Sequence, residues 1–291
     1  MSAAPTYLVV HPGAELFGSD RMMIESVRGL LDGGARVIVA LPGDGPAVEE
    51  LRAAGASVVI IPLFVLRKAL LKPSGWISFA KDALRGAAAA WRLLGRQRPD
   101  AVYVSTLTLP QWPAIARARR IPVVVHVHEA EESAPLVISW ALHAPLIPAQ
   151  VLIVNSEYTA RTVVRALPSS RTRMHVVLNG VSGPAQRAPL RNEITQLRLL
   201  FVGRLSPRKG AHDAMAALTT LRARGLDARL TLAGSTFTGY EWYEQELQDA
   251  AAHFPAETVQ FTGFVPDVWP VIAEHDVLII PGPLAAPFGN T

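Results

Sequence analysis

Short runs of β-branched and aliphatic residues alternate with segments of helical periodicity along this chain of 291 residues. The pattern predicts an α/β fold with doubly wound parallel sheets, because strands covered by helices on both faces are apolar throughout. In the first half, we expect strands at 7–11, 35–41, 57–62, 101–105, 122–128 and 151–155, and helices that include 20–31 and 49–54. The glycine-rich turns 32–34 and 42–45 agree with this division.

A polar, proline-containing stretch without periodicity occupies residues 184–196. We interpret it as a linker between an N-terminal Rossmann-like domain, 1–183, and a second α/β domain, 197–291, since a chain of this length is expected to form two cores. The second domain should contain strands 197–202, 228–233, 258–262 and 276–281, and helices 211–224, 240–252 and 268–274. Because the sequence stops soon after a strand, we expect this second domain to be incomplete.

The composition narrows the class of protein. Half of the residues are hydrophobic and 18% are charged, as in a globular protein, and the absence of cysteine excludes disulfides and cysteine-based metal sites. The net charge of +4 favours anionic partners such as nucleotide sugars or acidic phospholipids, whereas no basic stripe with interleaved aromatic residues indicates nucleic acid. Residues 1–5 do not resemble a signal peptide, and prolines interrupt the apolar run 134–154, which we expect to be buried core.

The clearest chemical signal is the stretch 199–210, where an apolar strand leads into Gly203, Arg204 and, five residues later, Lys209. A strand end, a glycine that permits close backbone approach and the N-terminus of a following helix form a typical diphosphate site. The order of residues is not that of a Walker A loop. The alternative is a pair of solvated cations, but cations at a helix N-terminus are unfavourable without an anion. No Asp-x-Asp pair occurs, so we expect no divalent metal.

His128 follows the strand 122–128, at the edge of the sheet where ligands of open α/β folds bind. We expect it to contact a ligand, and the alternative is a hydrogen-bonded core histidine. His126 lies on the same face of the strand and is interpreted as structural. Glu129 could accept a sugar hydroxyl or serve as a cap, and His11 is interpreted as a solvated or capping group.

Two further segments are candidates for binding. Gly13 and Gly18 bracket the loop after the first strand, where backbone could approach a donor phosphate or an acceptor, although a simple turn is the alternative. Residues 64–76 combine three cations with apolar and aromatic side chains. This composition is typical of a helix on an anionic membrane surface, and an ordinary surface helix is equally compatible with it.

Ordered landmarks over nearly the whole chain resemble those of family 4 glycosyltransferases, which have the two-domain GT-B fold and use nucleotide-sugar donors. The matching segments are Gly18-Ser19-Asp20-Arg21, Val125-His126-Val127-His128-Glu129, Val154-Asn155-Ser156, Leu178-Asn179-Gly180-Val181, Gly203-Arg204-Leu205-Ser206 with Lys209-Gly210, Leu232-Ala233-Gly234, Phe261-Thr262-Gly263-Phe264 and Pro287-Phe288-Gly289-Asn290-Thr291.

The resemblance implies retaining transfer of a sugar from a nucleotide-diphosphate donor to an acceptor hydroxyl, with a cell-surface glycan or glycolipid as acceptor and no other cofactor. It assigns catalytic roles to Arg204, Lys209 and His128. It assigns donor binding to Gly18, Ser19, Glu129, Gly203, Gly234, Phe288, Gly289, Asn290 and Thr291. Ser19 replaces a family glycine. Ala286 replaces a family glutamate, and a second glutamate would lie beyond Thr291, so we expect this chain to be a poor transferase.

Two alternatives remain open at this point. One is a nucleotide-sugar epimerase of the same fold, which would need carboxylates in the cleft. The other is a non-catalytic remnant. The transferase interpretation implies a cytoplasmic protein, with peripheral contact through residues 64–76 at the inner face of an anionic membrane.

Overall fold

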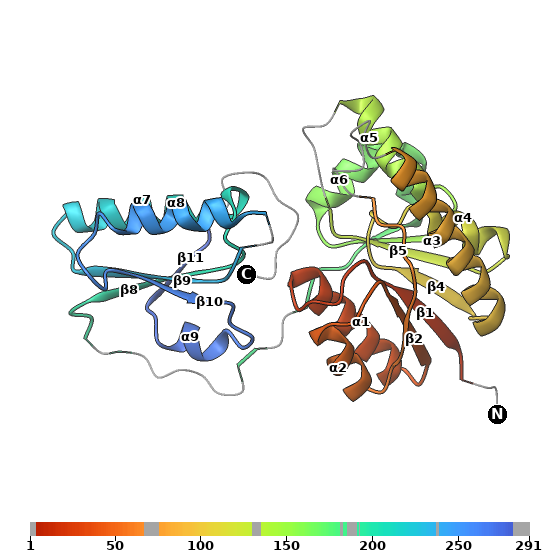
Figure 1. The fold of residues 1–291 in the computed structure, drawn as a ribbon, viewed down its shortest axis with the longest axis horizontal. Coiled ribbons are helices and arrows are strands. Elements are labelled where there is room, and N and C mark those ends of the chain that lie inside the picture. Colours follow the sequence, from red (N-terminus) through yellow and green to blue (C-terminus); the bar gives the residue numbers. More distant parts are fainter. Residues whose placement is uncertain are drawn as a thin grey trace. The chain divides into compact units, whose positions relative to one another are not determined.

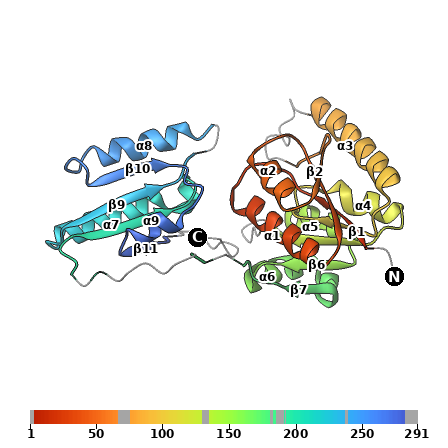
Figure 2. The same ribbon diagram turned by 90° about the horizontal axis from the view of Figure 1, so that it is seen from below.

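The computed structural model describes residues 4–66, 76–129, 135–180, 183–184, 191, 193–236 and 239–281. The chain divides into two compact units, an N-terminal unit from Met1–Gly180 and a C-terminal unit from Val181–Ala286. The expected linker 184–196 lies partly outside the described residues and stays a prediction. Each unit is an α/β structure built on a parallel sheet, which confirms the fold class (Figures 1 and 2).

The N-terminal unit contains a seven-stranded parallel sheet in the order β3-β2-β1-β4-β5-β6-β7. The strands are β1 (Thr6–Val10), β2 (Arg36–Leu41), β3 (Ser57–Ile60), β4 (Ala101–Val104), β5 (Val123–Val127), β6 (Val151–Val154) and β7 (Met174–Val176). The helices are α1 (Gly18–Asp32), α2 (Pro46–Ala53), α3 (Trp76–Gln97), α4 (Gln111–Ala118), α5 (Leu136–His143) and α6 (Glu157–Ala166). The strand order reverses between β1 and β4, where open α/β sheets bind ligands.

Two apolar layers cover the faces of this sheet. Alternate strand residues such as Val9 and Val39 pack with Met23, Ile24 and Val27 of α1 and with α2 on one face. Their neighbours in the strands pack on the other face with α3, α4 and α6, as Figure 1 shows. Local signals agree with these helices, because Pro46 begins α2 and the hydroxyl of Ser156 caps α6 by accepting from the N–H of Thr159 at 3.1 Å.

The C-terminal unit contains a four-stranded parallel sheet in the order β10-β9-β8-β11. Its elements are β8 (Leu197–Val202), α7 (Ala211–Ala223), β9 (Ala228–Ala233), α8 (Glu241–Ala251), β10 (Val259–Gly263), α9 (Trp269–Ala273) and β11 (Val277–Ile279). One face of the sheet packs against α7 and α8, through residues such as Leu218 and Leu247. α9 lies on the opposite side of the sheet (Figure 1).

Two sequence expectations need correction. The run 134–154 is not uniformly buried, because α5 exposes Leu136, Val137, Ile138 and Trp140, whereas Leu152 and Val154 are core. The interpretation of 64–76 as one interfacial helix is wrong over residues 64–66, which are not helical, whereas Trp76 belongs to α3. Residues 67–75 lie outside the described residues. The apolar residues at 134–154 include a surface helix because prolines divide the run into separate short elements.

Candidate functional site

The carboxyl ends of β1, β4 and β5, adjacent strands at the centre of the N-terminal sheet, bring together several polar side chains. His11 follows β1, Ser105 and Thr106 follow β4, and His128 and Glu129 follow β5. Because parallel strands end at the same edge, residues more than ninety positions apart become neighbours here, as with the 2.5 Å hydrogen bond between His11 Nδ1 and Ser105 Oγ. This edge is the candidate site of the N-terminal unit.

His11 is not a solvated group, which corrects the expectation from sequence. It is buried with 1% of its surface exposed, and its Nε2 lies 2.7 Å from Oδ1 of the buried Asp20. The second carboxylate oxygen of Asp20 accepts the backbone N–H of Phe17 at 2.9 Å and so caps the start of α1. The pair therefore attaches the N-terminus of α1 to the strand edge. The sequence could not predict this contact, because His11 and Asp20 are nine residues apart and joined by a loop without periodicity.

Gly18 and Ser19 form the exposed first turn of α1, above this buried pair. The loop before them is closely packed, since a Cβ atom on Gly13 would lie 3.1 Å from Oδ1 of Asp20. Asp20 thus holds both the loop and the helix. The exposed N-terminal turn of α1 is accessible to a ligand, and the assignment of Gly18 and Ser19 to donor binding stays a prediction.

His126 and His128 lie side by side on one face of the β5 end, with ring centroids 3.9 Å apart. The hydroxyl of Tyr103 is 2.5 Å from His126 Nδ1 and 3.2 Å from Ser26 of α1. Burial lowers the pKa of His126 to about 4. Burial, followed by repulsion from His126 and His11, lowers the pKa of His128 to about 3. Both imidazoles are therefore neutral at pH 7.

The Nε2 atom of His128 is buried and has no hydrogen-bond partner among the described residues. A buried polar atom without a partner costs free energy unless a ligand or water satisfies it. A neutral imidazole at this edge can donate a hydrogen bond to a ligand oxygen or accept one from a ligand hydroxyl. This geometry suits the predicted contact of His128 with a sugar. Nε2 of His126 is likewise buried and without a described partner.

Glu129 is held by the loop after β4. Its carboxylate accepts hydrogen bonds from the hydroxyl of Thr106, from the backbone N–H of Leu107 at 3.3 Å and from the backbone N–H of His128 at 3.1 Å. The N–H of Thr108 in turn donates to Thr106 Oγ1 at 3.0 Å. The carboxylate therefore fixes the two loops that carry Thr106 and His128. Its expected contact with the donor stays a prediction.

In the C-terminal unit, Gly203 and Gly234 lie side by side at the ends of β8 and β9. The φ angles are 152° and 153°, and a Cβ atom on Gly234 would lie 1.8 Å from the carbonyl oxygen of Gly203. Each N–H is used within the sheet, since Gly203 donates to Ala233 at 2.9 Å and Gly234 donates to Gly263 at 2.8 Å. Close backbone packing thus requires a glycine at 234, and the positive φ angles favour glycine at both positions, apart from any contact with a ligand.

Three cations follow Gly203. A 3₁₀ turn, Pro207–Lys209, and Gly210 with φ 76° lead into α7, whose N-cap provides no side-chain hydrogen bond. The pKa of Lys209 is lowered by partial burial and by repulsion from the Arg204 and Arg208 guanidinium groups. No carboxylate among the described residues forms an ion pair with Lys209. The neighbouring cations and the α7 N-terminus create a positive potential that suits an anionic ligand.

The four remaining predicted donor-binding residues, Phe288, Gly289, Asn290 and Thr291, lie outside the described residues, as does Ala286. Among the described candidates, the structure brings His128 and Glu129 together with His11 and α1. It separately brings Gly203, Gly234, Arg204 and Lys209 together. Sequence reasoning missed Tyr103, Thr106, Ser105 and the buried role of His11, which only strand pairing places at this edge.

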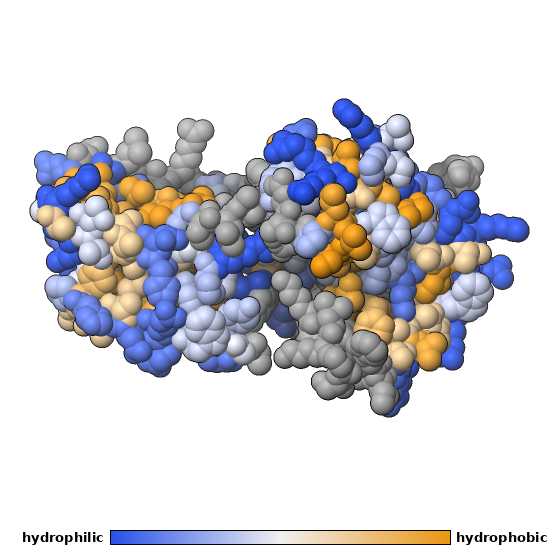
Figure 3. Space-filling model, turned by 90° about the horizontal axis from the view of Figure 1, so that it is seen from above, coloured by the Kyte–Doolittle hydropathy of each residue, from blue (hydrophilic) through white to orange (hydrophobic). Residues whose placement is uncertain are grey.

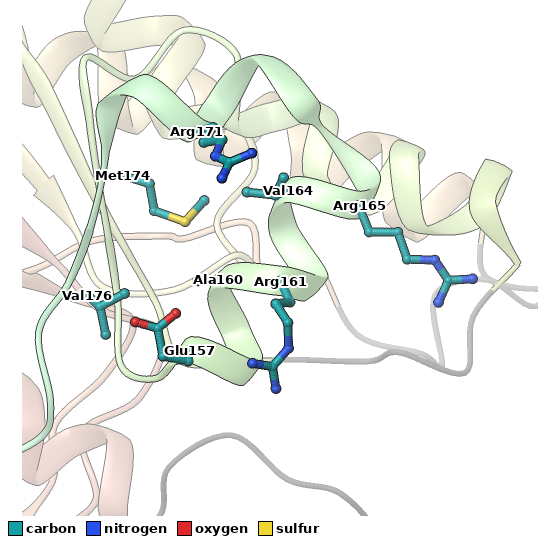
Figure 4. A pocket seen from close by; sticks show the side chains of 8 residues that line it. All are labelled: Glu157, Ala160, Arg161, Val164, Arg165, Arg171, Met174 and Val176. Carbon is teal, nitrogen blue, oxygen red and sulfur yellow. The ribbon is translucent and has the colours of Figure 1, made fainter.

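A groove of about 470 Å³ lies elsewhere on the N-terminal unit, between α6 and the edge strand β7 (Figure 4). Apolar residues including Val164 and Met174 line it, and Arg161, Arg165 and Arg171 surround them. None of its lining residues belongs to the candidate site. Within the part of the chain that the structure describes, there is no cluster of potential metal ligands and no helix long and apolar enough to cross a membrane.

Both units of the chain are similar to known glycosyltransferases. A family model described as Glycosyltransferase Family 4 matches residues 18–182, and a model described as Glycosyl transferases group 1 matches residues 196–291. A glycogen synthase of Mycobacterium tuberculosis is 27% identical over 208 residues, covering 66% of this chain and 48% of the relative. The chain thus spans about half the length of this curated relative.

A second relative from M. tuberculosis, a GDP-mannose-dependent alpha-(1-6)-phosphatidylinositol dimannoside mannosyltransferase, is 37% identical over 92 residues, or 31% of this chain and 22% of the relative. Among solved structures, Anabaena HepE in complex with UDP-glucose superposes with a TM-score of 0.77 at 20% identity, covering 98% of this chain and 76% of HepE. The lipopolysaccharide outer core galactosyltransferase WaaB gives a TM-score of 0.63 at 14% identity, covering 96% and 74% of the two chains. At these identities the structural likeness concerns the fold.

Proposed function

The chain belongs to glycosyltransferase family 4, and from this premise we propose that it is a retaining transferase that moves a sugar from a nucleotide-diphosphate donor to an acceptor hydroxyl. The observation that carries the proposal is the group of Arg204, Arg208 and Lys209 beside the α7 N-terminus, where repulsion from the two guanidinium groups lowers the pKa of Lys209 and the positive potential favours an anion. A nucleoside diphosphate supplies that anion.

In the proposed reaction, the acceptor attacks the face of the sugar from which the diphosphate leaves. Arg204 and Lys209 bind the leaving diphosphate and stabilise the negative charge that develops on it, so that the reaction needs no divalent metal. His128, which is neutral at pH 7, hydrogen-bonds the donor sugar through its buried Nε2 atom. The segment 197–291 binds the donor, and the domain 1–183 faces the acceptor.

The described carboxylates favour a transferase over an epimerase. Asp20 is committed to His11 and to the start of α1, and Glu129 is committed to the loop after β4. Neither is free to exchange protons with a sugar carbon in this arrangement. We further propose that the acceptor is a cell-surface glycan or a glycolipid and that the protein acts in the cytoplasm, where nucleotide sugars would reach it.

Isothermal titration with UDP and with GDP, in buffer that contains EDTA, tests the diphosphate site. These probes are chosen because HepE was solved with UDP-glucose and the mannosyltransferase is named for GDP-mannose. Arg204→Ala and Lys209→Ala should each weaken binding by roughly 1.5–3 kcal/mol, the cost of a lost charge-assisted contact. Arg224→Ala, at the exposed far end of the same helix, is the matched control and should not change the affinity. Equal affinity of the parent chain and both site variants would contradict the assignment of Arg204 and Lys209 to the diphosphate. Binding that EDTA abolishes and magnesium restores would contradict a diphosphate site that needs no metal.

A further inference from the structure

Helix α5 (Leu136–His143) has an inverted burial pattern. Its two buried residues are the polar Ser139 and His143, with 6% and 3% of their surfaces exposed. Its exposed large side chains are all apolar: Leu136 at 56%, Val137 at 79%, Ile138 at 53%, Trp140 at 53% and Leu142 at 37%. A surface helix of a water-soluble domain normally has the reverse arrangement.

The buried face of α5 is polar and contributes nothing to the apolar core. Within the helix, Nδ1 of His143 donates to the carbonyl oxygen of Ser139 at 2.7 Å, and no residue of α5 belongs to either apolar cluster of the described N-terminal unit. The helix therefore does not use its apolar side chains to pack on its own unit. Ile147, just beyond the helix, is also 51% exposed and extends the surface. A contiguous apolar patch of this kind marks an interaction site.

Basic residues lie on α6, the helix that packs against α5, and on the turn that follows it. α6 packs against α5, and its Arg161 and Arg165 are exposed and four positions apart, on one face of α6. Arg171, on the turn after α6, is also exposed, whereas Glu157 is the acidic residue among the side chains that line the same groove (Figure 4). Figure 3 shows apolar surface next to strongly hydrophilic surface on the face of the N-terminal unit where α5 lies in Figure 1.

We propose that α5 is a membrane-docking surface, which inserts its apolar side chains between the lipids of an anionic bilayer while Arg161 and Arg165 bind headgroup phosphates. A helix of eight residues is about 12 Å long, so it lies in the plane of the interface and does not span the bilayer. Trp140 suits the boundary between headgroups and acyl chains. The basic flank selects an anionic bilayer over an apolar protein surface, because arginines at a protein–protein contact of this kind would need acidic partners.

The test is flotation of the purified chain with vesicles of phosphatidylcholine and phosphatidylglycerol, compared with phosphatidylcholine alone. The variant Val137→Asp with Ile138→Asp changes two exposed side chains that belong to neither apolar core cluster of the N-terminal unit. Leu84→Asp, on α3 and 73% exposed, is the matched control for an added charge at an exposed apolar position of the same unit. We expect the double variant to bind mixed vesicles at least about tenfold more weakly and the control to bind as the parent chain does.

Two further measurements test whether an anionic membrane is the partner of α5. Arg161→Gln with Arg165→Gln should remove the preference for vesicles that contain phosphatidylglycerol, and brominated lipids should quench tryptophan fluorescence in the parent chain and markedly less in Trp140→Phe. Equal flotation of the parent chain and the Val137→Asp, Ile138→Asp variant overturns the proposal. The proposal is also overturned if the parent chain does not bind vesicles. This holds whether the parent chain is a monomer or a dimer that the double variant dissociates. None of these outcomes depends on sugar transfer, so the docking surface and the proposed activity can fail separately.

Discussion

At the scale of single residues, burial decides the chemistry of the two histidines at the end of β5. Burial lowers the pKa of His126 to about 4, against an ordinary value of 6.5. In the pH range between these values, the unfolded chain binds a proton at this position and the native chain does not. Stability therefore rises with pH through this range, and it is lost as the pH falls toward the native pKa.

We predict that the free energy of unfolding of the chain decreases from about pH 6.5 to about pH 4, with His126 contributing up to about 1.4 kcal/mol per pH unit. Urea titrations across this range measure the slope. His126→Gln should have a shallower slope, since glutamine takes up no proton in either state. His175→Gln, in the exposed part of β7, is the matched control. A His126→Gln slope as steep as that of the parent chain would contradict the buried, neutral state of this imidazole.

At the scale of secondary-structure elements, the junction of β8 and β9 depends on two glycine backbones in contact. Gly234 has φ 153°, and its Cα faces the carbonyl oxygen of Gly203 at a distance that leaves no room for a methyl group. Gly225, in the turn between α7 and β9, has φ 84° but open space around it. Alanine at Gly225 therefore measures the cost of a positive φ angle alone, whereas alanine at Gly234 adds the cost of a steric clash.

Gly234→Ala should destabilise the C-terminal unit by at least about 3 kcal/mol, because the clash forces β8 and β9 apart in addition to straining the backbone. Gly225→Ala should cost only about 1–2 kcal/mol, the strain of a left-handed residue with a side chain. Thermal unfolding followed by circular dichroism compares the two variants. Similar losses at both positions would show that the contact between Gly203 and Gly234 is not a constraint.

At the scale of the whole molecule, each apolar cluster of the described residues draws on one unit alone. Two clusters cover the two faces of the N-terminal sheet, and the third comprises residues of β8, β9, β10, α7 and α8 with their neighbours. The sheets are likewise separate. Units with their own sheet and core are expected to fold on their own.

We predict that residues 1–180, expressed alone, form a folded protein with a single cooperative urea transition. The measurement is unfolding followed by tryptophan fluorescence and by circular dichroism, and coincident curves are expected. The Val125→Asp variant of the same fragment is the control, since an aspartate in the centre of the buried sheet should abolish the transition. A fragment without any cooperative transition would mean that the core of the N-terminal unit depends on the rest of the chain.

The sequence alone determined the class of fold and much of the order of elements, because these follow from local periodicity. The strands Leu197–Val202 and Ala228–Ala233 have the predicted bounds, and the predicted helix 211–224 is present as α7, with Met215 and Leu218 buried. The stretch from Gly203 to Lys209 was also identifiable, since its glycine and its cations are close in sequence. Helix α5 was not predicted, because its almost uniformly apolar sequence lacks a clear polar face.

Only the tertiary structure decided which distant residues meet. His11, Asp20 and Ser105 form a buried group because β1 pairs with β4, and Tyr103 reaches His126 because β4 pairs with β5. Likewise, nothing local indicates that α5 turns Ser139 and His143 inward and leaves its apolar residues outside. The physical reason is that burial and hydrogen bonding depend on neighbours supplied by other elements, whereas periodicity reports only that an element has a face to bury.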